Sequence, residues 1–80
     1  MTNLEKYNNA FIETLGVSAE DLPGLKYQGI QAWDSVGHMN LVTAIEDAFD
    51  IMMDTTDIVA LSSYEIGKEI LAGSEYGIEF

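Results

Sequence analysis

Apolar positions at the start of the chain recur at the spacing of one helical face. They are Leu4, Tyr7, Phe11, Ile12 and Leu15. Thr2 and Glu5 have the three-residue spacing of a capping box, in which each side chain bonds the other residue's backbone N–H. Gly16 follows the last apolar position and is a common type of helix stop. The pattern therefore predicts a helix over about residues 3–15.

Residues 16–33 keep no sustained period. Residues 18–22 are compatible with one short helical turn, which Pro23 and Gly24 would end. A loop of this length in so small a chain is usually functional or disordered. Its apolar residues indicate that it packs onto the core, and they are Leu22, Leu25, Tyr27, Ile30 and Trp33.

A second helix is predicted over about residues 35–49, with Asp34 or Ser35 as its N-cap. On a helical wheel one third of its circumference is apolar and forms the core stripe, made by Leu41, Val42, Ile45, Ala48 and Phe49. The opposite side holds Val36, Met39, Asn40, Thr43, Glu46, Asp47 and Asp50. This helix therefore has two distinct surfaces.

Two further helices follow. A short one is predicted from Thr55 to Ala60. The last is predicted to start behind a second capping box, formed by Ser62 and Glu65, and to end at Gly73. We therefore expect one all-α domain over residues 1–80, a small four-helix bundle of three main helices and one short helix. Residues 73–80 have no predicted element and form a tail that is free to be flexible.

The charge of the chain narrows the partners it can have. Fourteen acidic residues face three lysines and no arginine, for a formal net charge of −11. Such a surface repels nucleic acids and anionic membranes and complements a cationic protein. The alternative is that the acids only confer solubility. The chain has no stretch of about 20 apolar residues and no signal-peptide pattern at its start, so a cytoplasmic protein is expected. We also expect it to be a monomer.

Val36 and Met39 lie among acids on the side of the second helix away from its core stripe. A small apolar patch with a charged rim is typical of a docking site, and methionine suits a surface that meets several partners. The alternative is that the long preceding loop folds over both side chains and buries them.

The tripeptide Asp34-Ser35-Val36 resembles the Asp-Ser-Leu motif of acyl carrier proteins, with valine in place of leucine. The similarity continues from Gly37 to Phe49 along that family's second helix, and from Asp57 to Leu71 along its third and fourth helices. The resemblance spans nearly the whole chain. It implies an acyl-carrier-protein-like bundle that has no catalysis of its own and acts as a substrate of partner enzymes.

The resemblance also implies a modification. In that family a phosphopantetheinyl transferase attaches 4′-phosphopantetheine from coenzyme A to the motif serine, here Ser35, and the cargo is carried as a thioester on the arm. Asp34 matches the aspartate that assists the modification through the transferase's metal, so no stable metal site is expected in this chain. An arm with its own thiol is consistent with the absence of cysteine.

By the same resemblance, partner enzymes with basic docking patches would contact the second helix. They would be an acyl- or aminoacyl-loading ligase, a ketosynthase or an acyltransferase. The matching positions are Val36, Met39, Asn40, Thr43, Glu46 and Asp47. Gly37 and His38 stand where the family often has an acidic residue just after the motif, and Asn40 replaces an acid common farther along. These departures indicate a different set of partners from that of the standard fatty-acid carrier.

Two other chemistries fit the residues poorly. Asp34, Ser35 and His38 contain the residue types of a hydrolase triad, but His38 falls within the core stripe and no oxyanion hole is apparent. The acids from Asp47 to Asp57 lack the central glycine of an EF-hand calcium loop.

The sequence therefore predicts a stand-alone acyl carrier for fatty-acid, polyketide or related specialised biosynthesis. Two alternatives stay open. One is a peptidyl or aminoacyl carrier, although Trp33-Asp34-Ser35 differs from the Gly-Gly-His-Ser motif often found there. The other is an unmodified acidic adaptor.

Overall fold

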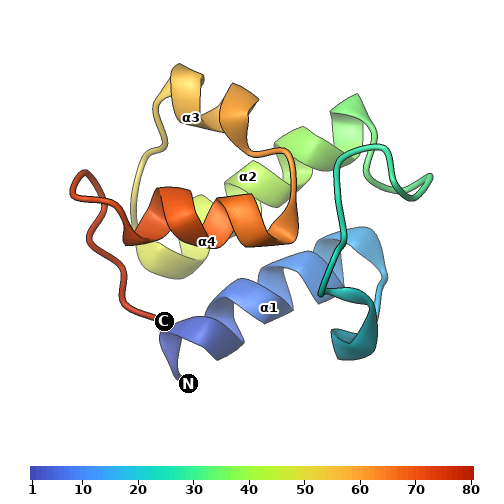
Figure 1. The fold of residues 1–80 in the computed structure, drawn as a ribbon, viewed down its shortest axis with the longest axis horizontal. Helices are drawn as coiled ribbons and strands as arrows, with labels where there is room; N and C mark the ends of the chain where they lie inside the picture. The colour runs from blue at the N-terminus through green and yellow to red at the C-terminus, as the bar shows by residue number, and fades with distance from the viewer.

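The computed structural model describes residues 1–80 as four α-helices with one short 3₁₀ turn. Their bounds are α1 (Asn3–Leu15), η1 (Ala19–Asp21), α2 (Ser35–Phe49), α3 (Thr55–Ala60) and α4 (Tyr64–Ala72). In Figure 1 the long loop that carries η1 lies at the right and α3 crosses the top of the molecule. The predicted all-α bundle of three main helices and one short helix is confirmed. None of the helices is both long and apolar enough to cross a membrane.

Helix α1 begins and ends where its sequence predicts. The Thr2 hydroxyl accepts a hydrogen bond from the Glu5 amide at 3.1 Å, and the Glu5 carboxylate accepts one from the Thr2 amide at 2.9 Å. At the other end Gly16 adopts φ 68°, a left-handed conformation that glycine reaches without strain. Its amide then donates to the Ile12 carbonyl at 2.9 Å.

The core is built around four aromatic rings from three parts of the chain. Tyr7 and Phe11 lie on α1, Trp33 ends the long loop and Tyr64 begins α4. Ring centroids within this group lie 4.9 to 5.5 Å apart, mostly edge to face, which is the favourable geometry for aromatic pairs. Helix α2 adds Leu41, Val42 and Ile45 to this core, as predicted, whereas Ala48 and Phe49 are half-buried.

The start of α4 differs from the prediction by one residue. Ser63, not Ser62, is the N-cap, and its hydroxyl accepts from the Ile66 amide at 3.0 Å. Ser62 is unsuited to the role because its carbonyl accepts a hydrogen bond from the Tyr27 amide at 2.9 Å. The prediction of a second capping box, formed by Ser62 and Glu65, is therefore wrong. The predicted end of this helix at Gly73 is confirmed.

The loop before α2 is held down on the bundle rather than detached from it. Leu22, Leu25 and Trp33 are buried, and Tyr27 and Ile30 are partly buried against the core, as the apolar pattern predicted. A single antiparallel bridge pairs Lys26 with Ser63, in the segment between α3 and α4. This pairing fixes the path of the loop toward the first residue of α2.

The tail after α4 folds back along the molecule. Ile78 is buried, and its amide donates to the Leu71 carbonyl at 2.9 Å. The Phe80 ring packs on Tyr7, with centroids 5.3 Å apart, and the Asn3 side-chain amide donates to the Glu79 carbonyl at 3.0 Å. The two ends of the chain therefore lie side by side, as Figure 1 shows.

Candidate functional site

The first turn of α2 presents Ser35 to solvent. Asp34 is the N-cap of the helix, and its carboxylate accepts a hydrogen bond from the Gly37 amide at 2.8 Å. Ser35, at the first helical position, is exposed and has no capping role. The sequence left both residues open as the cap, and the structure assigns that task to the aspartate. The serine hydroxyl is therefore available for another purpose.

Gly37 lets the long loop approach this turn. A side-chain carbon placed there would overlap the carbonyl oxygen of Ala32, which lies against the helix two residues before Asp34. Glycine avoids that collision because it has no Cβ. Glycine at this position therefore has a local structural reason. The loop and α2 are packed too closely here for any side chain.

Tyr27 reaches Ser35 from the long loop. The two hydroxyl oxygens lie 3.2 Å apart, and either of them can be the donor. The Tyr27 ring is half-buried and packs edge to face on His38 and Trp33, with centroids 5.3 and 6.3 Å apart. Sequence reasoning placed Tyr27 only as a packing residue. Nothing in its spacing from Ser35 indicated this contact.

His38 links the loop, α2 and α3. The indole N–H of Trp33, which can only donate, bonds to His38 Nδ1 at 3.0 Å. His38 Nε2 lies 2.8 Å from the Ile58 carbonyl, which can only accept, so this nitrogen carries the proton. Both ring nitrogens are therefore engaged, and neither is bonded to Ser35. The expected packing role of His38 is confirmed, and the residue is not placed as a base for the serine.

Replacing His38 with phenylalanine should lower the free energy of unfolding by about 2–4 kcal/mol, since it orphans the fully buried Trp33 indole and the Ile58 carbonyl. His38→Asn, whose amide oxygen can replace Nδ1 as acceptor, should cost less. Asn40→Ala, at an exposed position on the same helix, should change stability by under about 0.5 kcal/mol. Urea unfolding measures all three. Equal stability of His38→Phe and Asn40→Ala would contradict this role.

The predicted partner face of α2 is largely exposed. Val36 and Met39 are 70% and 53% exposed, so the loop does not bury them. Asn40, Thr43 and Asp47 are also exposed. The apolar start of the helix is therefore open to solvent, and the acidic Asp47 is exposed further along the same helix.

Glu46 differs from the rest of that face. It is half-buried, and its carboxylate accepts a hydrogen bond from the Met53 amide at 2.9 Å. The segment after α2 is therefore tied to the helix through this side chain. Thr43 also has an internal bond, since its hydroxyl donates to the Met39 carbonyl at 3.0 Å. Glu46 is therefore the predicted partner residue that also holds two segments of the fold together.

A small recess lies next to Tyr27, the residue whose hydroxyl contacts Ser35. It has a volume of about 220 Å³ and is lined by Tyr27, His38, Val59, Leu61 and Ser62. Val59, on α3, is 77% exposed. The sequence did not single out Val59, because a six-residue helix has too few positions to show two faces. The recess and this valine extend the site from α2 onto α3.

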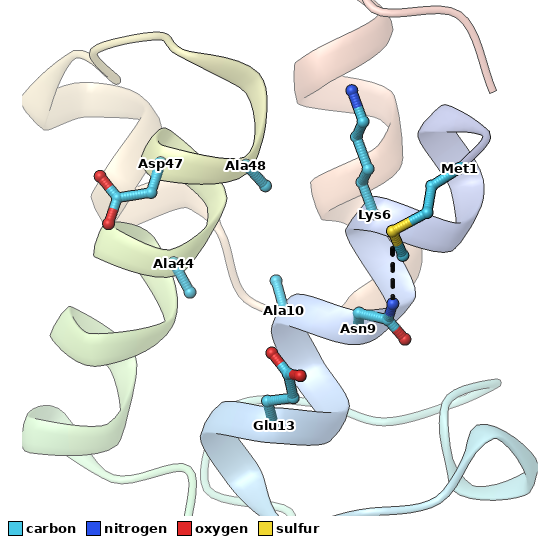
Figure 2. A pocket seen from close by; sticks show the side chains of 8 residues that line it. All are labelled: Met1, Lys6, Asn9, Ala10, Glu13, Ala44, Asp47 and Ala48. Carbon is cyan, nitrogen blue, oxygen red and sulfur yellow. Dashed lines mark hydrogen bonds between the residues drawn. The ribbon is translucent and has the colours of Figure 1, made fainter.

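The largest hollow is elsewhere. It is an open groove of about 530 Å³ between α1 and α2, and Figure 2 shows its lining. Lys6 and Asn9 come from α1, while Ala44 and Asp47 face them from α2. None of the residues around Ser35 lines it. The largest hollow is therefore separate from Ser35, and Asp47 is the one predicted partner residue that lines it.

The structure also brings together three carboxyl groups that the sequence left apart. Asp54 and Asp57 lie at the start of α3 and Glu75 lies in the tail, and their oxygens are all within 4.8 Å of one another. The Tyr76 hydroxyl donates to Asp57 at 2.6 Å and accepts from the Asp54 amide at 3.0 Å. A hydrogen bond to Asp54, together with the nearby charges, raises the pKa of Glu75 to about 7.

The acid cluster should make stability depend on pH. A carboxyl group with a higher pKa in the folded chain than in the unfolded chain binds its proton more tightly when folded, so stability falls as pH rises from about 4.5 to about 7. Glu75→Gln should leave the melting temperature unchanged near pH 4 and raise it near pH 8. Glu69→Gln, at an exposed α4 position, is the control for loss of one charge. Parallel pH curves for the two variants would refute the assignment.

Comparisons of the chain with protein-family models, with curated proteins and with solved structures found no match. The residues around Ser35 and the resemblance of the segment that begins at Asp34 are therefore the evidence that bears on function.

Proposed function

We propose that this chain is a stand-alone acyl carrier protein of the cytoplasm, which carries acyl intermediates as thioesters on a 4′-phosphopantetheine arm attached to Ser35. The observation that carries the proposal is that two neighbouring residues at the start of α2 have different roles. Asp34 caps the helix, and the neighbouring Ser35 hydroxyl is exposed without a capping role. A serine that only capped the helix would occupy the position of Asp34.

The residues around Ser35 are compatible with a phosphodiester. Ser35 and Val36 belong to the first turn of α2, whose amides have no acceptor within the helix and whose dipole favours an anion. The nearest acid, Asp34, is turned onto the Gly37 amide. The Tyr27 hydroxyl, 3.2 Å from Ser35 Oγ, can donate to a phosphate oxygen. The arm would supply the thiol that this cysteine-free chain lacks.

The partners in this proposal are other proteins. A phosphopantetheinyl transferase would modify Ser35, and loading or condensing enzymes would dock on Val36, Met39 and the acids of α2. Both apolar residues are exposed, and the net charge of −11 favours a basic docking patch. The chain would act as a monomeric substrate of these enzymes. Both nitrogens of His38 are bonded within the bundle, which is consistent with a serine that is activated from outside.

The test is an intact-mass measurement after incubation with coenzyme A, magnesium and a broad-specificity phosphopantetheinyl transferase. We expect one added arm per chain, and peptide mapping should locate it on Ser35. The hydroxyls of Thr43 and Ser62, both exposed, are internal controls that should stay unmodified. Loading the modified chain with acyl or aminoacyl donors would then decide between the two carrier types.

Failure of a well-folded chain to accept the arm from several transferases would reject the proposal. An acidic adaptor that docks a basic partner through the same face of α2 would then be the better explanation.

A further inference from the structure

Tyr27 holds its hydroxyl in place through contacts that do not involve Ser35. Its amide donates to the Ser62 carbonyl at 2.9 Å, and its ring meets His38 and Trp33 edge to face. His38 and Trp33 are in turn bonded to each other. The phenol oxygen is therefore fixed beside Ser35 Oγ, at 3.2 Å, by a rigid set of neighbours.

An exposed serine at the first position of a helix is otherwise free to rotate. Its Cα–Cβ bond has three staggered positions, and only some of them turn Oγ toward an incoming donor. A hydrogen bond to a fixed partner selects one of these positions. Since a net hydrogen bond shifts such an equilibrium by about two- to twelvefold, the phenol can hold the serine predominantly in one rotamer.

A phenol is suited to this place because it both accepts and donates. The free serine has an O–H that can donate to the Tyr27 oxygen, which leaves lone pairs of Oγ directed outward. The modified serine has no hydrogen on Oγ, so the phenol must then donate, and the anionic phosphodiester is a strong acceptor. The same hydroxyl can therefore serve both states without moving.

We propose that Tyr27 is the positioning residue of the modification site: it orients the Ser35 hydroxyl before transfer and bonds the phosphodiester afterwards. This inference rests on the proposed function. In the transfer, Ser35 Oγ forms a bond to phosphorus and the phosphoanhydride bond of coenzyme A breaks. Adenosine 3′,5′-bisphosphate leaves with the bonding electron pair, and the serine proton passes to a base of the transferase.

The test compares Tyr27→Phe with Tyr76→Phe. The first substitution removes only the oxygen beside Ser35 and keeps the ring contacts. The second removes the same atom from a tyrosine of the tail, which Figure 1 places on the side of the molecule opposite the long loop. Circular dichroism and thermal melting establish that both variants are folded.

Three measurements follow. In the unmodified chain, the Hα–Hβ scalar couplings of Ser35 should report one rotamer for wild type and Tyr76→Phe and an average for Tyr27→Phe. In the transferase assay, Tyr27→Phe should lower kcat about three- to tenfold with little change in KM. In the modified chain, the phosphorus NMR resonance should move in Tyr27→Phe and stay in place in Tyr76→Phe.

Unaveraged Ser35 couplings in Tyr27→Phe, or a kcat equal to that of Tyr76→Phe, would overturn the positioning role before transfer. An unmoved phosphorus resonance would overturn the contact after transfer. The coupling measurement needs no transferase, so it tests the positioning of Ser35 even if the wild-type chain accepts no arm. Absence of modification in wild type rejects the proposed function itself and is seen before any variant is compared.

Discussion

Ser35→Ala is expected to abolish the addition of the arm completely while leaving the bundle intact. The substitution removes the acceptor oxygen. The residues on either side, Asp34 and Val36, have no hydroxyl that could accept the arm instead. Because Asp34 supplies the cap, the helix keeps its hydrogen bond to the Gly37 amide. The only internal bond lost is the exposed one to Tyr27. We therefore expect the free energy of unfolding to change by less than about 1 kcal/mol.

Measuring modification and stability together distinguishes loss of the acceptor residue from unfolding of the chain. Intact mass after the transferase reaction measures the first, and thermal melting with circular dichroism measures the second. Ser74→Ala is the matched control, since it makes the same substitution at an exposed serine of the tail and should accept the arm as wild type does. A full added arm on Ser35→Ala would show that another residue is the acceptor.

Gly67→Ala should strongly destabilise the bundle. A side-chain carbon there would overlap the hydroxyl of Tyr7 and lie 2.6 Å from a methyl group of Leu61. Tyr7 is fully buried and cannot retreat, because its hydroxyl donates to the Tyr64 carbonyl at 2.6 Å and its ring is packed between Phe11 and Tyr64. Glycine at this position is what allows α4 to approach α1 so closely.

The expected cost combines overpacking with the loss of a buried hydrogen bond, about 3–5 kcal/mol together. Alanine's better helix propensity offsets about 1 kcal/mol of that. The net loss, about 2–4 kcal/mol, is a large share of the total stability of so small a domain. The melting temperature should fall by roughly 10–20 °C.

A double-mutant cycle identifies the cause. Tyr7→Phe alone should be mildly destabilising, since it leaves the Tyr64 carbonyl without its donor. Added to Gly67→Ala, it removes the closer of the two colliding atoms, so the double variant should be more stable than the sum of the two single changes predicts. Additive effects would mean that Gly67 is required for some reason other than its approach to Tyr7.

The parts of the fold that were predictable from sequence are those decided by local contacts. The cap at Thr2, the stop at Gly16 and the core stripe of α2 depend on residues within a turn or two of each other. The prediction for the start of α4 was wrong because that start depends on a contact between residues far apart in the sequence. Ser62 and Ser63 are equally good caps, and a distant bond from Tyr27 to the Ser62 carbonyl decides between them.

The same distinction between local and distant contacts applies to the candidate site. Asp34 and Ser35 could be found in the sequence as a cap pair and a motif at a helix start, and a helical wheel placed Val36 and Met39 away from the core stripe. Tyr27 could not, since its loop has no period and its path depends on the bridge between Lys26 and Ser63. The grouping of Glu75 with Asp54 also depends on how the tail folds back, which no local pattern specifies.

The meeting of the chain ends has a practical consequence for engineering. Asn3 bonds the Glu79 backbone and Phe80 packs on Tyr7, so a short linker could join the two ends without stretching the bundle. Figure 1 places both ends on the side of the molecule away from the long loop that leads into α2. An affinity tag, a fluorescent fusion or a surface tether attached at either end would therefore leave the Ser35 face open to large enzymes.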